Sequence, residues 1–265
     1  MRFDDLDKRM RIYETSADIC VLPGMYMVAR LDGRSFTKLT KETCQFETPF
    51  DIRFRDLMTA TAKSLMECGF RVIYAYTESD EISILFDLDE QTYGRKLRKY
   101  NSTLAGEASA QFSIMLGQPA SFDCRISQLP SEVLVVDYFR WRNEDSVRNA
   151  LNAWCYWTLR ENGKDKEQAT KQLIGISVSQ KNELLFQYGI NFNNLPNWQK
   201  RGVGLYWEEY DKSSINPMTS QTVITSRRRI RLDYDLPIKD AYGQFVQSII
   251  QSQHRKETCH GNFTR

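Results

Sequence analysis

Two β-rich runs separated by a short polar segment constrain the fold of this chain more than any other feature. Val72–Tyr76 and Ile82–Phe86 are rich in aromatic and β-branched residues, and only Thr77–Glu81 lies between them. Because this connection is short enough for a tight turn, the pattern predicts a β-hairpin.

A third run builds a larger unit around this hairpin. Met25–Leu31 is apolar, follows Pro23-Gly24 and ends at Asp32-Gly33, so it predicts a buried strand with a carboxylate at its carboxyl end. Residues 51–68 carry a helical apolar stripe that stops at Gly69, which predicts a helix between this strand and the hairpin. The segments together predict a helix-bridged β-α-β-β unit.

The other predicted elements extend this unit. They are a short amphipathic helix packed at one edge over residues 4–16, a long helix over 92–117, a strand over 122–126 and a largely helical segment over 131–160. We expect an α+β domain with flanking helices over residues 1–160 and a C-terminal region with short helices over 161–265, with a linker or turn at 162–166.

Charge and cysteine usage limit the classes of protein to consider. The 265 residues carry 36 Lys and Arg against 34 Asp and Glu, and a net charge of +2 removes bulk attraction to nucleic acid as an argument. The six cysteines include no C-x-x-C pair, which argues against a disulfide framework or a zinc ribbon. With a polar N-terminus and no apolar stretch of membrane-spanning length, we expect a cytoplasmic protein without a membrane partner.

Three carboxylates carry the strongest chemical signal. Asp32 ends the first predicted strand, while Asp80 and Glu81 lie in the hairpin connection, so neighbouring strands could bring all three together. Oxygen ligands of this kind suit Mg²⁺, and two such ions would stabilise a phosphoryl-transfer reaction. Gly33 would let the backbone approach a metal or phosphate closely. The alternative interpretation is an ordinary β-turn at Asp32-Gly33 and a polar hairpin tip.

Two basic groups could complement these carboxylates. Arg95, Lys96 and Lys99 begin the predicted helix over 92–117, where their spacing would let them bind a triphosphate or simply form a solvated face. Arg227-Arg228-Arg229 with Arg231 could contact RNA phosphates or lie on a solvated strand.

Several ordered motifs resemble those of the tRNA-His guanylyltransferase family. Residues 30–36 read R-L-D-G-R-S-F, similar to the family's R-I-D-G-R-x-F, and residues 79–81 match its S-D-E motif. Residues 137–142 look like its D-Y-F-x-W-R segment, and residues 181–202 are similar to its K-N-E-x-x-F…I-N-x-N-N…R-K-G region. The resemblance covers roughly residues 1–210.

This resemblance implies a polymerase-palm-like catalytic domain that adds nucleotides to RNA 5′ ends, with ATP or GTP as substrates. It implies that Asp32, Asp80 and the Gly33 carbonyl hold two Mg²⁺ ions while Glu81 supports the site. Arg34, Ser35, Phe36, Thr37 and Ser79 would line the nucleotide-binding site. Arg95, Lys96 and Lys99 would contact the triphosphate. Contacts to tRNA would come from Arg148, Asn149, Lys181, Asn182, Lys200 and Arg201, and the separate basic run adds Arg227 and Arg228 as expected contacts. A homotetramer, a dimer of dimers, is implied as well.

Two departures from the family pattern refine the expected activity. Ser146-Val147-Arg148-Asn149 stands where eukaryotic members carry H-I-N-N, and Thr48-Pro49-Phe50-Asp51 stands where the family has K-P-N-D. The first departure favours the Thg1-like branch, which extends 5′-truncated tRNA on a template, over dedicated addition of G at position −1 of tRNA-His. The second removes the motif's lysine. A nucleotide cyclase and a non-catalytic RNA-binding protein stay as alternatives.

Overall fold

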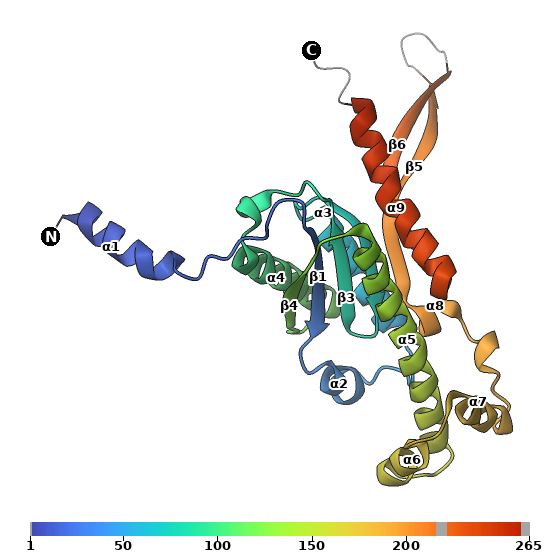
Figure 1. Ribbon diagram of the computed structural model, residues 1–265. Helices are drawn as coiled ribbons and strands as arrows, with labels where there is room; N and C mark the ends of the chain where they lie inside the picture. The colour runs from blue at the N-terminus through green and yellow to red at the C-terminus, as the bar shows by residue number, and fades with distance from the viewer. Residues whose placement is uncertain (1, 216–221, 261–265) are drawn as a thin grey trace.

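The computed structural model describes residues 2–215 and 222–260, with side chains for residues 2–213 and 222–252. Its centre is a six-stranded antiparallel sheet in the order β4-β1-β3-β2-β5-β6 (Figure 1). The strands are β1 Tyr26–Gly33, β2 Val72–Glu78, β3 Glu81–Phe86, β4 Phe122–Leu129, β5 Val203–Ile215 and β6 Thr222–Asp233.

Helices surround this sheet in the described part of the chain. The α-helices are α1 Phe3–Thr15, α2 Phe36–Lys38, α3 Ile52–Glu67, α4 Leu97–Leu116, α5 Glu132–Glu161, α6 Lys166–Leu173, α7 Val178–Gln187, α8 Asn197–Arg201 and α9 Lys239–His260. A π-helix covers Leu39–Thr43, and 3₁₀ turns cover Thr92–Arg95 and Phe192–Asn194.

The first four strands have the topology of a ferredoxin-like motif. The chain runs β1-α3-β2-β3-α4-β4, and β1 lies between β3 and β4. The predicted β-α-β-β unit and the α+β, palm-like class are therefore confirmed. Side-chain caps begin α3 and α5, because the Asp51 carboxylate accepts the Arg53 amide at 2.7 Å and the Ser131 hydroxyl caps α5.

The sheet is covered on both faces. On one face, α3 and α4 pack over alternate residues such as Ala29, Leu31 and Ile84. On the other, α5 and α9 pack over Val28, Tyr74 and Leu85, and the far half of α5 forms a smaller core with α6 and α7. Alternation along β1 therefore leaves Arg30 and Asp32 on the α5 face, in register with Ser83 and Glu81 of β3.

Three sequence-based expectations about the elements need correction. The helix predicted over 92–117 begins only at Leu97, because Tyr93, Gly94 and Arg95 have φ of 53°, 59° and 59° and cannot continue a right-handed helix. The α1 helix is confirmed, but it buries no residue and extends away from the sheet instead of packing at an edge (Figure 1). In the C-terminal region, the short helices are accompanied by a long β5–β6 hairpin and α9.

The C-terminal region completes the sheet begun by residues 1–160. β5 pairs with β2 from Tyr74↔Tyr206 to Thr77↔Val203, and β6 continues outward from β5. Residues 161–265 thus contribute strands to the same sheet, and the end of α5 at Glu161 does not separate two sheets. No helix in the described ranges is both long enough and apolar enough to cross a membrane.

Candidate active site

The end of β1 meets the β2–β3 turn, and this junction brings Asp32 and Asp80 together. Asp32 is in register with Glu81, and the Gly33 amide donates to the Asp80 carbonyl at 2.9 Å. The strands are longer than expected, so the turn contains only Ser79 and Asp80, with Ser79 at a φ of 47°. Glu81 is accordingly the first residue of β3 and not part of the turn, which corrects its predicted place.

Arginines on two neighbouring strands neutralise Asp32. The Arg125 Nη2 atom of β4 lies 2.7 Å from Asp32 Oδ2, and Arg30 Nε lies 3.3 Å from the same oxygen. Register explains the pairing: Asp32 lies opposite Asp123 and Arg30 opposite Arg125, so the attractive contact to Arg125 runs diagonally across the strands.

Glu81 belongs to a buried ion network with α5. Arg142 donates to Glu81 through Nε at 2.8 Å and Nη2 at 2.7 Å, and Nη2 also contacts Glu78 at 3.1 Å. Asp145 lies 3.3 Å from Arg142 Nη1. Desolvation, opposed by Arg142, raises the pKa of Glu81, and desolvation together with the charge of Glu81 raises the pKa of Glu78. One guanidinium thus holds several carboxylates beside the β2–β3 turn.

Asp80 is in a different environment, since no cation contacts it in the described part of the chain. Its carboxylate accepts a hydrogen bond from the Ser79 hydroxyl at 3.2 Å. Desolvation and the nearby charge of Asp32 raise the pKa of Asp80. The environment therefore favours a cation between these carboxylates. The described residues contain no converging set of three His, Cys, Asp or Glu ligands, and Mg²⁺ needs only one or two carboxylates when phosphates complete its shell.

A cavity of about 420 Å³ opens next to these carboxylates. Asp32, Ser79 and Asp80 line one side of it, and α5 contributes Arg142 and Ser146. Its apolar lining is largely aromatic and includes Phe36, Phe46, Phe50, Phe54, Trp157 and Trp198. This volume and the mixture of aromatic and polar groups suit a nucleotide-sized ligand.

The residues expected to line the nucleotide divide into two groups. Phe36, Thr37 and Ser79 line the cavity, whereas Arg34 and Ser35 are exposed and do not. Gly33 has a packing role, because a Cβ there would lie 2.5 Å from the Phe36 ring. The close approach it allows is therefore to Phe36, which packs against Phe54, Phe112 and Phe122.

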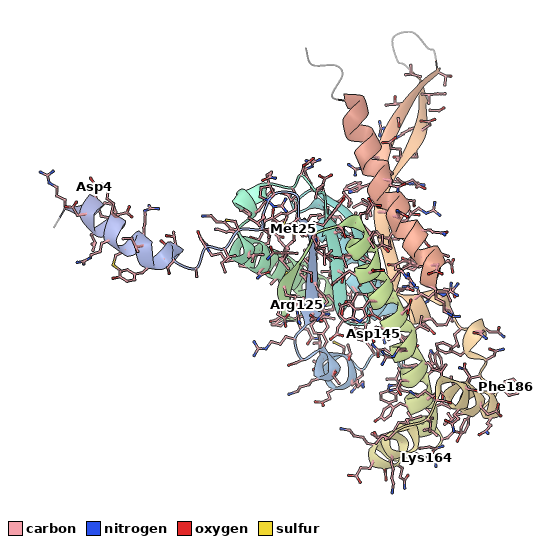
Figure 2. The ribbon with its side chains drawn as sticks, in the orientation of Figure 1. Asp4, Met25, Arg125, Asp145, Lys164 and Phe186 are labelled. Atoms are coloured by element: carbon pink, nitrogen blue, oxygen red, sulfur yellow. The ribbon has the colours of Figure 1, made fainter. Side chains whose placement is uncertain are left out.

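Arg95, Lys96 and Lys99 lie at the opposite end of β1 from Asp32. Arg95 is buried and donates to the carbonyls of Met25, Leu88 and Glu90, while Lys96 pairs with Asp18 at 2.8 Å. Met25 precedes β1, and Arg125, the partner of Asp32, lies toward the other end (Figure 2). Within one chain these cations do not reach the carboxylates, because the left-handed turn at 93–95 directs Arg95 into the interior.

The residues expected to contact tRNA also differ in whether they lie near the cavity. Asn149 lines the cavity, and Arg148 is 77% exposed beside Asp145, so both lie near the carboxylates. Lys200 is buried and donates to the Asn193 carbonyl at 2.7 Å, and Arg201 donates to the Leu236 carbonyl at 2.8 Å. Both therefore join elements of this chain, and the expectation that Lys200 contacts tRNA is corrected. Lys181 and Asn182 belong to α7 and do not line the cavity.

The basic run lies on the exposed β6 strand. Arg228 stacks over Trp207 with 4.1 Å from its Cζ to the ring centroid, whereas Arg229 and Arg231 both pair with Glu208. Arg227 is exposed and has no ion pair within the described ranges.

Several residues of the site were missed by sequence reasoning. Arg142 lies in the D-Y-F-x-W-R segment, so a search for a cation to accompany the carboxylates could have found it. Arg125 alternates with Asp123 on a predicted strand, which indicates a shared face. Lys41 and Trp157 also line the cavity, but nothing local in the sequence distinguishes them.

A palm-like sheet that presents two carboxylates beside a nucleotide-sized cavity defines a nucleotidyltransferase of the palm class. Family models are more specific: one described as "tRNAHis guanylyltransferase" matches residues 7–130, and one described as "Thg1 C terminal domain" matches residues 133–254. The chain belongs to the tRNA(His) guanylyltransferase family, which confirms the resemblance of its motifs.

Individual relatives agree with this assignment. The chain is 35% identical to a tRNA(His) guanylyltransferase of Debaryomyces hansenii over 82% of this chain and 88% of the relative. It is 34% identical to a probable tRNA(His) guanylyltransferase of Drosophila melanogaster over 70% of this chain and 68% of the relative.

Solved structures agree as well. A bacterial tRNA(His) guanylyltransferase (Thg1)-like protein in complex with ATP has a TM-score of 0.75 and 28% identity, covering 92% of this chain and 98% of its own. The Saccharomyces cerevisiae tRNA(His) guanylyltransferase has a TM-score of 0.68 and 27% identity, covering 74% of this chain and 91% of its own.

Proposed function

We propose that this protein is a Mg²⁺-dependent, template-directed 3′-to-5′ nucleotidyltransferase that adds nucleotides to the 5′ end of truncated tRNA. The observation that carries the proposal is the meeting of Asp32 and Asp80 beside the aromatic-lined cavity. A solved relative of the Thg1-like type is a complex with ATP and another with GTP, which supports ATP or GTP as the nucleotide substrate.

The donor set fits Mg²⁺. Asp32, Asp80 and the Gly33 carbonyl supply hard oxygen ligands, and the desolvated Asp80 carboxylate beside Asp32 favours a nearby cation. When bound, Mg²⁺ would lower the pKa of the attacking hydroxyl and neutralise charge on the phosphates. Glu81 would support this site from β3, where Arg142 fixes its carboxylate.

The proposed reaction has an activation and an addition stage. ATP or GTP first transfers its nucleotidyl group to the 5′-monophosphate of the RNA with release of pyrophosphate, and the 3′-hydroxyl of an incoming nucleoside triphosphate then attacks that 5′-phosphate and releases AMP or GMP. In both stages, the aromatic lining of the cavity would hold the nucleotide and exclude water from one of its faces. Pairing with the opposite RNA strand would select the nucleotide, in keeping with Ser146 at the position of the family's histidine.

Contacts to tRNA would come from two places, the surface beside the cavity and the exposed strand β6. Asn149 and Arg148 lie near the cavity and would contact the 5′ end, while Arg227 and Arg228 on β6 would contact backbone phosphates farther away.

We also propose a cytoplasmic location, which suits the free Cys20, Cys44, Cys68, Cys124 and Cys155.

A homotetramer belongs to the same proposal. α1 exposes Phe3, Met10, Ile12 and Tyr13, and none of its residues is buried. A 13-residue helix is marginal in water by itself, so packing against another copy would account for it. Light scattering coupled to gel filtration, before and after removal of residues 1–15, tests this assembly.

Extension of labelled, 5′-truncated tRNA by the purified protein with Mg²⁺, ATP and nucleoside triphosphates tests the activity. We expect extension with the intact protein and none with Asp80→Ala; an inactive intact protein would contradict the proposal.

The names of the relatives favour a second candidate function, addition of G at position −1 of tRNA-His. A template-directed enzyme should add G opposite C far better than opposite A on that tRNA, whereas a dedicated guanylyltransferase should not.

A further inference from the structure

Lys41 is a cation of the cavity that the proposed function does not yet use. It lies in the π-helix Leu39–Thr43, on the segment that connects α2 to α3. Its side chain lines the same cavity as Asp32 and as Ser79 and Asp80 of the β2–β3 turn. Single π-helical turns interrupt regular structure at a cost and are frequent at functional sites.

Charge in the cavity makes Lys41 distinctive. The lining holds six acidic residues, Asp32, Glu47, Asp51, Glu78, Asp80 and Glu81, against the basic residues Lys41, Arg55 and Arg142. Arg142 is engaged by Glu78, Glu81 and Asp145, and Arg55 pairs with Asp56 at 2.7 Å while it stacks on Trp198. Among the described residues, Lys41 alone of these three lining cations has no carboxylate partner.

The ammonium group of Lys41 instead lies over an aromatic ring. Lys41 Nζ is 4.9 Å from the centroid of Trp157, which α5 presents to the cavity. Lys41 is an exposed residue, and a cation–π contact at an exposed site is weaker than a charge-assisted hydrogen bond to phosphate. A phosphate that enters the cavity would therefore displace this contact.

The segment that carries Lys41 is firmly held at both of its ends. Thr40 Oγ1 donates to the Phe36 carbonyl at 2.7 Å, and Phe36 is locked in the aromatic core. Farther along, the Asp51 carboxylate accepts the amides of Glu47 at 2.8 Å and Arg53 at 2.7 Å. These hydrogen bonds restrain the backbone from which the long, exposed Lys41 side chain extends.

No other residue of this segment offers a cation to the cavity. Thr48 lines the cavity where the family motif K-P-N-D has its lysine, and it is uncharged. Lys38 is exposed one turn earlier and does not line the cavity. Lys41 is therefore placed to supply the positive charge on this wall.

From this arrangement we propose that Lys41 binds the phosphates of the nucleoside triphosphate and that Trp157 holds its ammonium group when the cavity is empty. The inference rests on the proposed function for the identity of the ligand. It adds a phosphate-binding residue from the segment between α2 and α3, outside the S-D-E turn and the D-G-R motif.

Equilibrium dialysis with labelled ATP, GTP and AMP in the presence of Mg²⁺ tests the inference on the full chain. Lys41→Gln should weaken ATP and GTP binding about 10-fold, the usual scale for one charge-assisted contact, and AMP binding less than about 2-fold. Lys38→Gln, which removes the same charge from the same segment, should leave all three affinities unchanged. Lys41→Arg should restore most of the affinity for ATP.

A second variant separates the roles of the lysine and the ring. Trp157→Leu removes the ring that holds the free ammonium group and also part of the aromatic lining, so Lys41→Gln should still weaken ATP binding about 10-fold when it is added to this variant. Melting temperatures of the Lys41 and Lys38 variants should match that of the intact protein, because both lysines are exposed. A loss of ATP affinity in Trp157→Leu without one in Lys41→Gln would overturn the inference, since the ring would then be the ligand contact.

The remaining outcomes distinguish this inference from the proposed function. Equal affinities of Lys41→Gln and the intact protein for ATP overturn the inference, while tRNA extension by the intact protein still supports the proposed function. ATP binding that depends on Lys41, in a protein that does not extend tRNA, supports the inference and overturns the proposed function. An intact protein that binds neither ATP nor GTP overturns both.

Discussion

Arg142 binds Glu81 through two parallel hydrogen bonds, with Nε 2.8 Å from Oε1 and Nη2 2.7 Å from Oε2. Because α5 contributes the arginine and β3 the carboxylate, this pair joins the helix to the strand that follows the Ser79-Asp80 turn. The bidentate geometry needs the planar guanidinium, and lysine cannot reproduce it.

Replacing Arg142 should therefore destabilise the protein strongly. Arg142→Met leaves the buried Glu81 carboxylate without its bidentate partner, and loss of one partner from a buried pair costs about 3–5 kcal/mol. Urea denaturation followed by circular dichroism measures this change in the free energy of unfolding. Arg11→Met breaks only the exposed pair with Asp7 and should have little effect. Equal stabilities of the two variants would contradict the role assigned to Arg142.

The stability of the protein should fall as pH rises from about 5 to about 8. Burial raises the pKa of Glu78 from its usual 4.5 to about 8, so the folded state holds this proton after the unfolded chain has released it. Stability from such a group is present below the unfolded pKa and is lost as pH rises through the folded pKa. The slope approaches about 1.4 kcal/mol per pH unit for one proton.

Glu78→Gln isolates this contribution. The variant removes the titrating group but keeps a hydrogen-bonding side chain, so the urea midpoint should depend less on pH between 5 and 8. Glu14→Gln, on the exposed α1 helix, serves as the control and should retain the slope of the intact protein. A slope unchanged by Glu78→Gln would assign the pH dependence to other groups.

Gly33 is required by packing, and alanine at this position should destabilise the fold. An added Cβ would lie 2.5 Å from the Phe36 ring, and such overpacking typically costs about 1–3 kcal/mol. Because the clash involves one ring, Gly33→Ala and Phe36→Leu together should cost less than the sum of the two single changes. Thermal unfolding of the four proteins in this cycle provides the measurement, and strict additivity would exclude a direct clash.

The meeting of Asp32 and Asp80 was predictable because register follows from chain order. A strand that ends at Asp32 and a hairpin with Asp80 in its turn place both carboxylates at one end of the sheet when the first strand pairs antiparallel with the strand that follows the turn. The exposed arginines of β6 gave a weaker signal, since only Ile230 and Leu232 alternate as apolar residues among them. That strand pairs with β5 mainly through its backbone and its Arg–Glu and Arg–aromatic contacts.

Long-range contacts determine the positions of the side chains that local sequence patterns could not predict. Helical periodicity around Arg95 does not reveal the left-handed turn at 93–95, and the carbonyl of Met25 that accepts its proton lies 70 residues earlier in the chain. Lys200 likewise resembles a surface cation in sequence, although α8 buries it against the Asn193 carbonyl. A charge can be counted from sequence, but its partner depends on the fold.

Arg227 and Lys200 should therefore affect tRNA binding differently. Arg227 is exposed without an ion pair in the described ranges, so Arg227→Gln should weaken binding and reduce the slope of log affinity against log salt by about one. Arg229→Gln should do less, because Glu208 already pairs with Arg229 at 2.7 Å. Lys200→Met should lower the melting temperature and leave the salt slope unchanged. Filter binding across a salt series checks these expectations.

Arg125 should compete with divalent metal ions for Asp32. Its Nη2 atom lies 2.7 Å from Asp32 Oδ2, so a metal ion that binds this oxygen must displace or share the contact. The arginine side chain is 55% exposed, and an exposed ion pair contributes at most about 1 kcal/mol. Without nucleotide, the Arg125→Gln variant should therefore bind Mn²⁺, used as a probe for Mg²⁺, up to about fivefold more tightly than the intact protein does.

Electron paramagnetic resonance of free Mn²⁺ measures this affinity directly, without reliance on enzyme turnover. Arg98→Gln removes an arginine that pairs with Asp18 at the opposite end of β1, and it should bind Mn²⁺ like the intact protein. Asp32→Asn should abolish the difference between the Arg125 variant and its parent, because the contested carboxylate is then gone. If Arg125→Gln bound Mn²⁺ more weakly than the intact protein, Arg125 would be a support of the metal site and not its competitor.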